Sequence, residues 1–481
     1  MAGSTVWIWR LVGCGLLLAA VGTVSARPAA KPLAVAQLEF PAPLVAPGER
    51  PEVGYDTRKI PAATGFLYVR NNTQHAFTRV ALRRRKASKQ SVSSDRLRVL
   101  RAVVPASLVR GHRLFYYAVV HDAKSGRSVR VPAGSFESAW VLTGARIVRL
   151  GTHRFGHLRS PEAVVARAGP KDVAFENPAQ GPKQGPWSFA VARDRSIWLL
   201  DEFNKRLLVW APGEPNARPR PVPLGSFYPV DFALGPAGSF YVTGCPPGLS
   251  LCRLTATGRV LWTTTLATDV FNTQLRLGPD GTLYLTGGVP TSPRTERGGD
   301  VWMPVATRDG KPLSPAQQRR RSLGGYQPLH GGLRLVSAIA GWEKDWAYGR
   351  APHEERFALI DPTRGRLVRS WRITSRTVIW PHPAATPALL GGNPVVLLEV
   401  TRGSGKSFKD EYVVLRLAQT ASGTLARFSL PHGRAVEPKP ARAAWGDVIT
   451  DLRIGPGAKL YQLGSSPTTG VKIYRYSLAP G

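Results

Sequence analysis

Two stretches of sequence decide the fold: LGPAGSFY at residues 234–241 and LGPDGTLY at residues 277–284. VARDRSIW at residues 191–198 repeats the pattern, and so does IGPGAKLY at residues 454–461. In each copy an apolar residue precedes a short polar turn, and an alternating strand with an aromatic second residue follows. The first three copies lie 43 residues apart. This spacing indicates a repeating structural unit.

The length of the repeat predicts a β-propeller. A four-stranded blade needs about 40–45 residues, and neighbouring blades bury each other's faces. We therefore expect residues 150–481 to form a closed ring of about six blades, with inner strands near residues 197, 240, 283, 335, 396 and 460. The Asp-Gly or Ala-Gly pair in the turn supplies the positive φ that a tight hairpin needs. A seventh, degenerate blade within residues 150–180 is left open.

Residues 56–145 predict a smaller domain of short strands. Residues 65–70 and 113–120 alternate without helical periodicity, and a five-residue connection ending at Gly126 predicts a hairpin. About six or seven strands in about 90 residues suit a β-sandwich. The run LFYYAVV at residues 114–120 resembles the fibronectin-like or immunoglobulin-like modules of bacterial surface proteins. The chain is thus expected to be all-β, a sandwich followed by a propeller.

The first 26 residues are typical of a secretory signal peptide. Residues 11–24 are apolar, and Ala26 ends a small-residue cleavage pattern. Cleavage there predicts a secreted, extracellular or cell-wall-associated protein without a membrane span in the mature chain. Lipidation at Cys14, or retention of the segment as an anchor, stays open as an alternative. Residues 27–55 carry six prolines and no periodicity, which predicts a semi-extended, proline-rich linker.

Two cysteines, Cys245 and Cys252, remain once the signal peptide is removed. In an oxidising compartment, two cysteines seven positions apart around a Pro-Pro-Gly turn predict a disulfide. A redox or metal site is the alternative. The sequence lacks a Cys-x-x-Cys spacing and any nearby histidine to support it.

The formal charge of +34 comes from 65 basic and 31 acidic residues. Such an excess is typical of proteins that bind anionic surfaces such as nucleic acid, teichoic acid or phospholipid. The composition, rich in Arg, Ala, Gly and Pro, also resembles that of proteins from GC-rich bacteria such as actinobacteria, and a solvated basic face needs no partner. Only residues 83–86 and 319–321 form dense basic runs. The expected export argues against a nucleic-acid partner.

Residues 196–210, with the sequence SIWLLDEFNKRLLVW, resemble an NHL repeat, in which Asp, Asn and Arg separate two strands. Asp201, Asn204 and Arg206 fall on the family's turn positions. The resemblance implies that these side chains tie the turn together, with a ligand role as the alternative. Later copies end in Thr-Gly and lack this motif, so the propeller is more firmly indicated than the family.

A search for chemistry in the sequence nominates no catalytic residue, metal site or cofactor. None of the nine histidines shares a repeat position with another, and no nucleophile elbow, phosphate-binding loop or dinucleotide fingerprint occurs. One long loop carries Trp342, Glu343, Asp345 and Trp346. Tryptophan beside carboxylates is typical of carbohydrate-binding surfaces, and a tryptophan buried under a charged loop is the plainer alternative.

The leading functional hypothesis is a monomeric, non-enzymatic binding or scaffold protein of the cell exterior or envelope. It would recognise a protein or a polysaccharide through propeller loops on one face of the ring. The first alternative is a lyase or hydrolase with a metal on the propeller axis, as in some NHL-like propellers. The second is a binder of an anionic polymer such as a cell-wall polymer.

Overall fold

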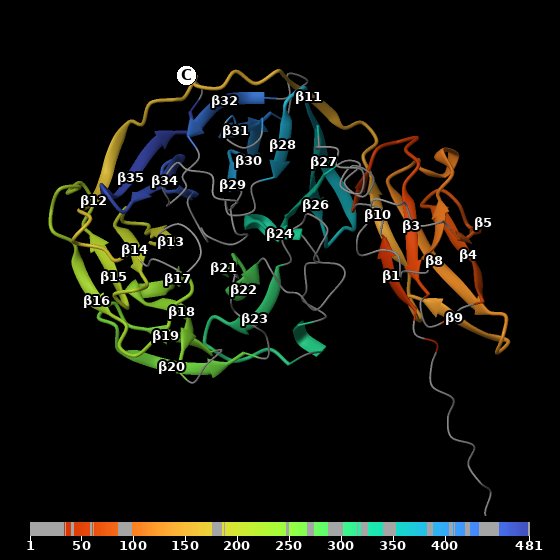
Figure 1. The fold of residues 1–481 in the computed structure, drawn as a ribbon, viewed down its shortest axis with the longest axis horizontal. Helices are drawn as coiled ribbons and strands as arrows, with labels where there is room; N and C mark the ends of the chain where they lie inside the picture. Colours follow the sequence, from red (N-terminus) through yellow and green to blue (C-terminus); the bar gives the residue numbers. More distant parts are fainter. Residues whose placement is uncertain are drawn as a thin grey trace, which may run out of the picture.

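The computed structural model has an all-β fold: a β-sandwich followed by a β-propeller (Figure 1). The structure describes residues 33, 35–39, 43–57, 60, 62–84, 99–175, 185–186, 188–246, 250–266, 274–286, 302–314, 316–318, 326–339, 353–381, 388–403, 407, 409–418, 424–431 and 452–479. Within these residues, we find no helix of the length and apolar character needed to span a membrane. The expected signal peptide, residues 1–26, lies outside them.

The N-terminal domain consists of two sheets. One has the strand order β1-β3-β7-β6, and the other has the order β2-β10-β8-β4-β5 with β9 also paired to β8. The strands are β1 (Ala36–Glu39), β2 (Leu44–Val45), β3 (Glu52–Asp56), β4 (Ala63–Asn71), β5 (Thr78–Ala81), β6 (Arg83–Arg84), β7 (Val99–Val103), β8 (Arg113–Asp122), β9 (Arg127–Val131) and β10 (Glu137–Val141).

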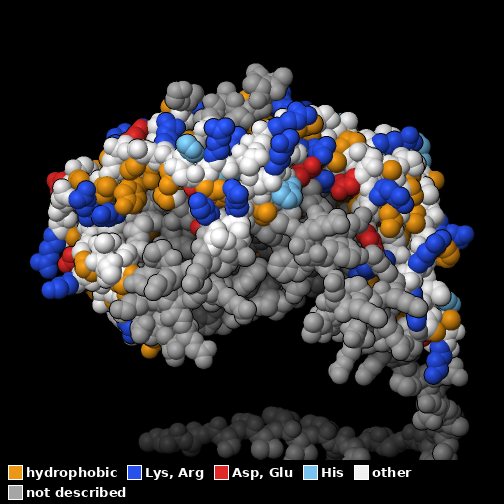
Figure 2. All heavy atoms as spheres, turned by 45° about the horizontal axis from the view of Figure 1, so that its top comes forward, with side chains coloured by type: hydrophobic (Ala, Val, Ile, Leu, Met, Phe, Trp, Pro, Cys, Tyr) orange, Lys and Arg blue, Asp and Glu red, His pale blue; other side chains and the backbone are white. Residues whose placement is uncertain are grey.

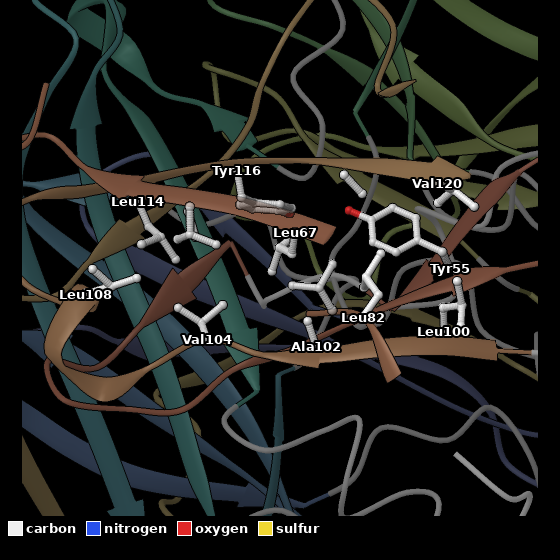
Figure 3. Packing of buried hydrophobic residues seen from close by; sticks show 14 of the residues in the cluster. Tyr55, Leu67, Leu82, Leu100, Ala102, Val104, Leu108, Leu114, Tyr116 and Val120 are labelled. Atoms are coloured by element: carbon white, nitrogen blue, oxygen red, sulfur yellow. The ribbon is translucent and has the colours of Figure 1, made fainter. Parts of the chain in front are cut away.

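The sandwich core lies between these sheets because their strands alternate buried and outward-facing residues. On β4 and β8, Leu67, Leu114 and Tyr116 are buried, whereas their immediate neighbours in sequence are more exposed. Figure 3 shows them packed with Tyr55 of β3 and Leu100 of β7. Because side chains alternate between the two faces of a strand, every second residue of β4 and β8, beginning at Thr64 and Arg113, faces away from this core.

The structure corrects the expected linker over residues 27–55. Its described part contains β1, β2 and most of β3, and Val53 and Tyr55 lie in the sandwich core. Prolines concealed these strands from the sequence analysis. The described prolines, Pro43, Pro47 and Pro51, lie between the strands and not within them, so they do not interrupt the pairing.

The described strands from residue 146 onward form six sheets arranged as the blades of a ring (Figure 1). Blades 1 to 3 comprise β13 (Ser188–Val191), β14 (Ile197–Asp201), β15 (Arg206–Trp210) and β16 (Arg220–Pro223); β17 (Phe232–Leu234), β18 (Phe240–Cys245), β19 (Ser250–Leu254) and β20 (Val260–Thr265); and β21 (Gln274–Leu277), β22 (Thr282–Thr286) and β23 (Met303–Thr307).

Blades 4 to 6 are larger or are completed by strands from elsewhere in the chain. They comprise β24 (Tyr326–Pro328), β25 (Arg334–Ile339), β26 (Glu354–Asp361) and β27 (Arg366–Ser375); β28 (Val378–Pro381), β29 (Ala388–Leu390), β30 (Asn393–Arg402), β31 (Lys409–Leu417) and β32 (Thr424–Pro431); and β33 (Leu452–Gly455), β34 (Lys459–Ser466) and β35 (Gly470–Ser477). Apolar clusters pack blade 1 against blades 2 and 6, blade 2 against blade 3, and blade 5 against blades 4 and 6.

The repeated sequence pattern is the hairpin that joins the first and second strands of a blade. The strands expected to be innermost, near residues 197, 240 and 283, are in fact the second strands. The first strands β13, β17, β21 and β33 approach one another around the axis instead. At the same turn position, Gly238 and Gly281 have positive φ, as predicted, and Arg195 and Ala458 adopt it without being glycine.

The aromatic residue of the pattern packs on its own hairpin. A side chain placed on Gly235 would meet the ring of Tyr241, and one placed on Gly278 would meet Tyr284. The tyrosine lies flat against the glycine, so the two residues recur together. This contact explains the spacing that identified the blades.

The segment 146–168 pairs with the outer strands of blades 4 and 6 and contacts blade 5 between them. β11 (Arg146–Gly151) pairs in parallel with β27 on the outer edge of blade 4, and β12 (Ala163–Ala168) pairs with β35 of blade 6. Between them, Arg159 N donates to Ser429 O of blade 5. The described residues 150–175 therefore contribute edge strands, not a seventh blade, and the propeller begins at residue 146 instead of 150.

The two domains meet on a face of blade 4 formed by β25 and β26. Leu44, Trp140 and Leu142 of the sandwich pack against apolar residues of β25 and β26. Buried Arg356 donates to Leu44 O (3.1 Å) and to Glu49 Oε2 (2.7 Å). These contacts hold the sandwich against the propeller.

A second charged group lies beside this junction. Glu354 accepts hydrogen bonds from Arg356 (2.8 Å) and Arg372 (2.8 and 2.9 Å). Neighbouring Glu355 is completely buried, and its carboxyl group makes no well-formed hydrogen bond among the described residues. Burial, only partly offset by Arg356, raises the pKa of Glu355 well above its ordinary value.

Candidate functional site

The three residues of the NHL-like turn bond within their own blade. Asp201 is completely buried at the end of β14. Its Oδ2 accepts from Asn204 Nδ2 (2.9 Å) and Arg206 Nε (2.8 Å), and its Oδ1 accepts from Ala174 N (3.0 Å). Arg206 also donates to Asp172 O (2.6 Å). This geometry matches the structural interpretation and leaves Asp201 no surface for a ligand.

Cys245 and Cys252 form a disulfide, with their Cα atoms 6.3 Å apart. The bond joins β18 to β19 within blade 2, and both residues are buried. The disulfide is part of the core of blade 2. By itself it does not form an active site.

The other residues nominated from sequence give no site among the described residues. Trp342, Glu343, Asp345 and Trp346 lie outside the described part of the chain. His153 Nε2 is 2.7 Å from Glu411 Oε2, and the pair ties the outer segment to β31. No group of three or more His, Cys, Asp or Glu side chains within the described ranges has a metal-binding arrangement.

A charged cluster lies where the first strands of the blades meet. Asp231, directly before β17, is completely buried. It accepts from Ser188 Oγ of blade 1 (2.5 Å), and from Leu275 N (2.7 Å) and Arg276 Nη1 (3.1 Å) of blade 3. Arg453 occupies the position in β33 that Arg276 occupies in β21, and its Nε donates to Phe189 O (3.0 Å). One carboxylate thus links three consecutive blades.

The chemistry of this axial cluster is that of a structural brace. Burial, followed by the positive charge of Arg276, lowers the pKa of Arg453, and Asp231 acts in the opposite direction. Both carboxylate oxygens of Asp231 are occupied by protein donors. A general base must have a lone pair within reach of a substrate. Asp231 does not meet this requirement.

The outward side of the sandwich sheet carries the most unusual surface in the described structure. Phe66, Tyr68 and Arg70 alternate along β4, and Arg113, Phe115 and Tyr117 alternate along β8. The pairing places Tyr68 beside Tyr117, and Arg70 beside Phe115. Residues that alternate along paired strands share one face. Arginines and aromatic rings therefore intermingle on this side of the sheet.

The rings and guanidinium groups stack across the strands. Tyr68 and Tyr117 are parallel to within 5°, with ring centroids 4.9 Å apart. The Arg130 guanidinium of β9 lies 4.0 Å from the centroid of the Tyr117 ring. On the other side, Arg79 of β5 is directly opposite Tyr68 in register and lies 4.4 Å from the Phe66 ring. A line of planar groups thus crosses four strands.

A second line runs beside the first. Arg70 lies 4.9 Å and Arg113 5.3 Å from the centroid of the Phe115 ring. Arg70 also contacts Phe77, and Arg113 contacts Trp140, which is buried in the domain junction. The surface therefore starts at the junction and extends away from the propeller.

We call this surface the arginine–aromatic face, defined by Phe66, Tyr68, Arg70, Phe77, Arg79, Arg113, Phe115, Tyr117, Arg130 and Phe136. Phe66 is 37% and Phe136 47% exposed. Three of the arginines each donate a hydrogen bond to the protein: Arg70 Nη1 to Gln74 O (2.9 Å), Arg113 Nη2 to Ser138 Oγ (3.1 Å) and Arg130 Nη2 to Ser135 O (3.1 Å).

Acidic partners are missing from the face. Among the described residues, no Asp or Glu forms an ion pair with any of its four arginines, whereas Arg206, Arg276, Arg356 and Arg372 all have one. Figure 2 shows the wider setting: acidic side chains are few on the side in view, and basic and hydrophobic ones adjoin over the N-terminal domain at the right. Four clustered positive charges create a strong local field.

Comparisons with known proteins were made against this geometry. No protein-family model matches the chain, and no curated protein matches it. The chain is similar to the PQQ domain of pyranose dehydrogenase from Coprinopsis cinerea, with 11% identity, a TM-score of 0.35, and coverage of 68% of this chain and 100% of that one. It is also similar to Drosophila plexin A in complex with semaphorin 1b (10%, 0.28, 66% and 82%).

A third similar structure is the β-propeller domain of Nup133 from Vanderwaltozyma polyspora, with 10% identity, a TM-score of 0.24, and coverage of 61% of this chain and 84% of that one. Likenesses this distant give no information about activity. They show neither an NHL family nor a bacterial origin for this chain. Functional inference therefore depends on its own residues.

The sequence analysis missed the arginine–aromatic face, although the signal was present. The sequence predicts strands at residues 65–70 and 113–120. In the first strand the even-numbered residues 66, 68 and 70 are Phe, Tyr and Arg. In the second the odd-numbered residues 113, 115 and 117 are Arg, Phe and Tyr. Which of the two faces is outward depends on the partner sheet. That sheet includes β1 and β3, which the sequence analysis placed in a linker.

Proposed function

We propose that this protein is a non-enzymatic binding protein of the cell exterior or envelope that recognises an acidic partner on the arginine–aromatic face. The observation that carries the proposal is the set of four arginines stacked on aromatic rings without an acidic partner among the described residues. The location rests on the signal peptide expected at residues 1–26. An NHL-like propeller of bacterial origin is part of the same proposal, supported by residues 196–210.

The arrangement of the arginines argues for a partner. Isolated surface arginines are solvated and need no explanation. Here four like charges are gathered on one sheet, and stacking holds their guanidinium groups in fixed planes. Stacking also costs side-chain freedom before any ligand arrives. An acidic ligand would relieve the mutual repulsion, and the preorganised guanidinium groups would lose little further entropy on binding.

The surface composition suits recognition better than catalysis. Arginine, tyrosine and other aromatic residues are enriched where binding energy is concentrated. The face has no carboxylate to serve as a base among the described residues. The axial cluster, where the alternative of a lyase or hydrolase would place its chemistry, holds its carboxylate against protein donors. We therefore propose that recognition takes place on the sandwich, whereas the sequence alone had led us to expect it on the propeller loops.

The proposal can be tested on immobilised heparin, used as a generic acidic polymer. The variant Arg79→Gln/Arg130→Gln removes two charges from the face, and Arg193→Gln/Arg218→Gln removes two exposed charges from the propeller. We expect the first variant to elute at clearly lower salt than the second, because local charge density governs binding to polyanions. Identical elution of both variants would show that retention follows net charge alone, and the proposal would fail.

A further inference from the structure

The ring faces of the arginine–aromatic face are already covered by the protein. Tyr117 is stacked between Tyr68 on one side and the Arg130 guanidinium on another, with Phe77 and Phe136 at its edges. Binding of single-stranded nucleic acid relies on open aromatic faces on which bases stack. Tyr117, at the centre of the face, therefore offers no such platform.

What the face does present is a set of polar edges. In Arg70, Arg113 and Arg130 the Nε atom is buried and one Nη atom donates to the protein. The second Nη group of each is the donor left for an oxygen of carboxylate, sulfate or phosphate. The hydroxyl groups of Tyr68 and Tyr117 make no hydrogen bond to any described part of the protein. Hydroxyl groups both donate and accept. The face therefore combines sites for oxyanions with sites for neutral hydroxyl groups.

These groups follow an order across the sheet. The strands run β5-β4-β8-β9, so the line reads Arg79, Tyr68, Tyr117, Arg130. Strands lie about 4.8 Å apart, which separates its ends by roughly 14 Å. Two cationic positions thus flank two hydroxyl-bearing positions. A ligand that fits this order has oxyanions separated by hydroxyl-rich units.

We infer that the partner is an acidic polysaccharide that lies across the strands of the arginine–aromatic face, with its oxyanions on the guanidinium edges and its hydroxyl groups on Tyr68 and Tyr117. The inference rests on the proposed function and deepens it. Acidic sugar chains carry oxyanions and hydroxyl groups on the same or neighbouring units, whereas the acidic side chains of a peptide, Asp and Glu, bring no hydroxyl group with them. Repeated units also let one chain engage both lines of arginines at once.

The inference can be tested by measuring affinity at fixed salt for four acidic probes of matched charge. These are heparin oligosaccharides, oligogalacturonates, single-stranded oligo-dT and poly-L-glutamate, with dextran as the neutral control. The full chain is used in three forms: unchanged, Tyr68→Phe/Tyr117→Phe, and Arg79→Gln/Arg130→Gln. The tyrosine variant keeps the stacked rings and removes only the hydroxyl groups.

We expect at least one of the two polysaccharides to bind about tenfold tighter than oligo-dT and poly-L-glutamate, and the tighter of the two identifies sulfate or carboxylate as the preferred oxyanion. The tyrosine variant should lose about tenfold toward the polysaccharide, as expected for two hydrogen bonds, and nothing toward poly-L-glutamate. The arginine variant should weaken binding of all acidic probes.

The outcomes separate the two proposals. Equal or tighter binding of oligo-dT or poly-L-glutamate, or an unchanged affinity of the tyrosine variant for polysaccharide, would overturn the polysaccharide inference and leave an acid-binding face. If the arginine variant binds every acidic probe as well as the unchanged protein does, the face is not a binding surface, and both proposals fall.

Discussion

The propeller axis and the outer face of the sandwich both concentrate charge, and they use it in opposite ways. At the axis, Arg276 donates to buried Asp231 and to the carbonyl oxygen of Leu275, so its charge helps to hold neighbouring blades together. On the sandwich, Arg70 and Arg130 rest on aromatic rings and have no acidic partner among the described residues. Arginine side chains thus stabilise contacts between blades at the axis, whereas on the sandwich they offer hydrogen-bond donors to a ligand.

The difference teaches that the charge of a basic protein is informative only through its partners. The net charge of +34 applies to both regions and distinguishes neither. Burial and pairing do distinguish them: a buried, paired charge contributes to stability, whereas a stacked, unpaired one costs little to expose and can be neutralised by a ligand. The following predictions test this contrast, beginning with the largest effect.

Asp231→Ala should cause the largest loss of stability. It leaves Arg276 buried without its carboxylate and removes the acceptor of Ser188, which costs about 3–5 kcal/mol in comparable buried pairs. Urea denaturation measures the loss, and Asp231→Asn provides a milder change if the alanine variant does not fold. Asp361→Ala, which removes a carboxylate paired with exposed Arg364, should have far less effect. Equal losses in the Asp231 and Asp361 variants would contradict the axial brace.

Loss of the disulfide should have the next largest effect. Closing an eight-residue loop restricts the unfolded chain, so Cys245→Ala/Cys252→Ala should lower the free energy of unfolding by about 2–3 kcal/mol. Denaturant unfolding with and without reductant checks this value. Retention on heparin should be unchanged, because the bond lies in blade 2, away from the arginine–aromatic face. A parallel loss of retention would mean that recognition depends on the propeller after all.

Glu355 provides a third test, because its carboxyl group is completely buried and forms no ion pair among the described residues. Its raised pKa means that the folded protein holds this proton after the unfolded chain has released it. The free energy of unfolding should therefore fall as pH rises from about 4.5 toward the raised pKa, by about 1.4 kcal/mol per pH unit.

The variant Glu355→Gln isolates this effect, since the amide cannot titrate. Unfolding curves of the two proteins should agree near pH 4.5, and the variant should become progressively more stable than the unchanged protein above it. Parallel pH profiles would show that Glu355 is ionised in the folded protein, and that the junction pairs it with a charge.

Arg130→Gln should have the smallest effect on stability. It removes the cation–π contacts with Tyr117 and Phe136, each worth about 0.5–1 kcal/mol. Its effect should be evident in binding instead, as a lower salt concentration for elution from heparin. A loss of stability as large as that of Asp231→Ala would mean that the arginine–aromatic face is a brace like the axis, and the contrast between the regions would disappear.

The fold could be predicted from sequence wherever it repeats. The pattern at residues 234–241 and 277–284 gave the blades because Tyr241 and Tyr284 pack on glycines of their own hairpins, a local contact that the sequence records directly. The disulfide was predictable for the same reason, since its cysteines are seven positions apart in the sequence. The count of six blades followed from the 43-residue spacing together with the inner strands expected near residues 335, 396 and 460, and it left a seventh blade open.

Features that depend on distant partners were not predictable. β11 and β12 join blades whose other strands lie hundreds of residues away, so nothing local marks them as part of the ring. The pattern of the arginine–aromatic face was visible along β4 and β8. Its exposure was not, because it depends on which side the opposing sheet covers. The axial role of Asp231 required three blades to meet.

The pairing of β12 with β35 also determines the order in which the two domains can complete their folding during synthesis. Ala163 and Arg475 are register partners, yet more than 300 residues separate them in the chain. The sandwich strands are complete once β10 has been synthesised, whereas blade 6 must wait for residues 470–477 of β35. Contacts between such distant segments form slowly because a long loop must close first. Until then the nascent propeller is an open row of blades, and its final strand turns that row into a ring.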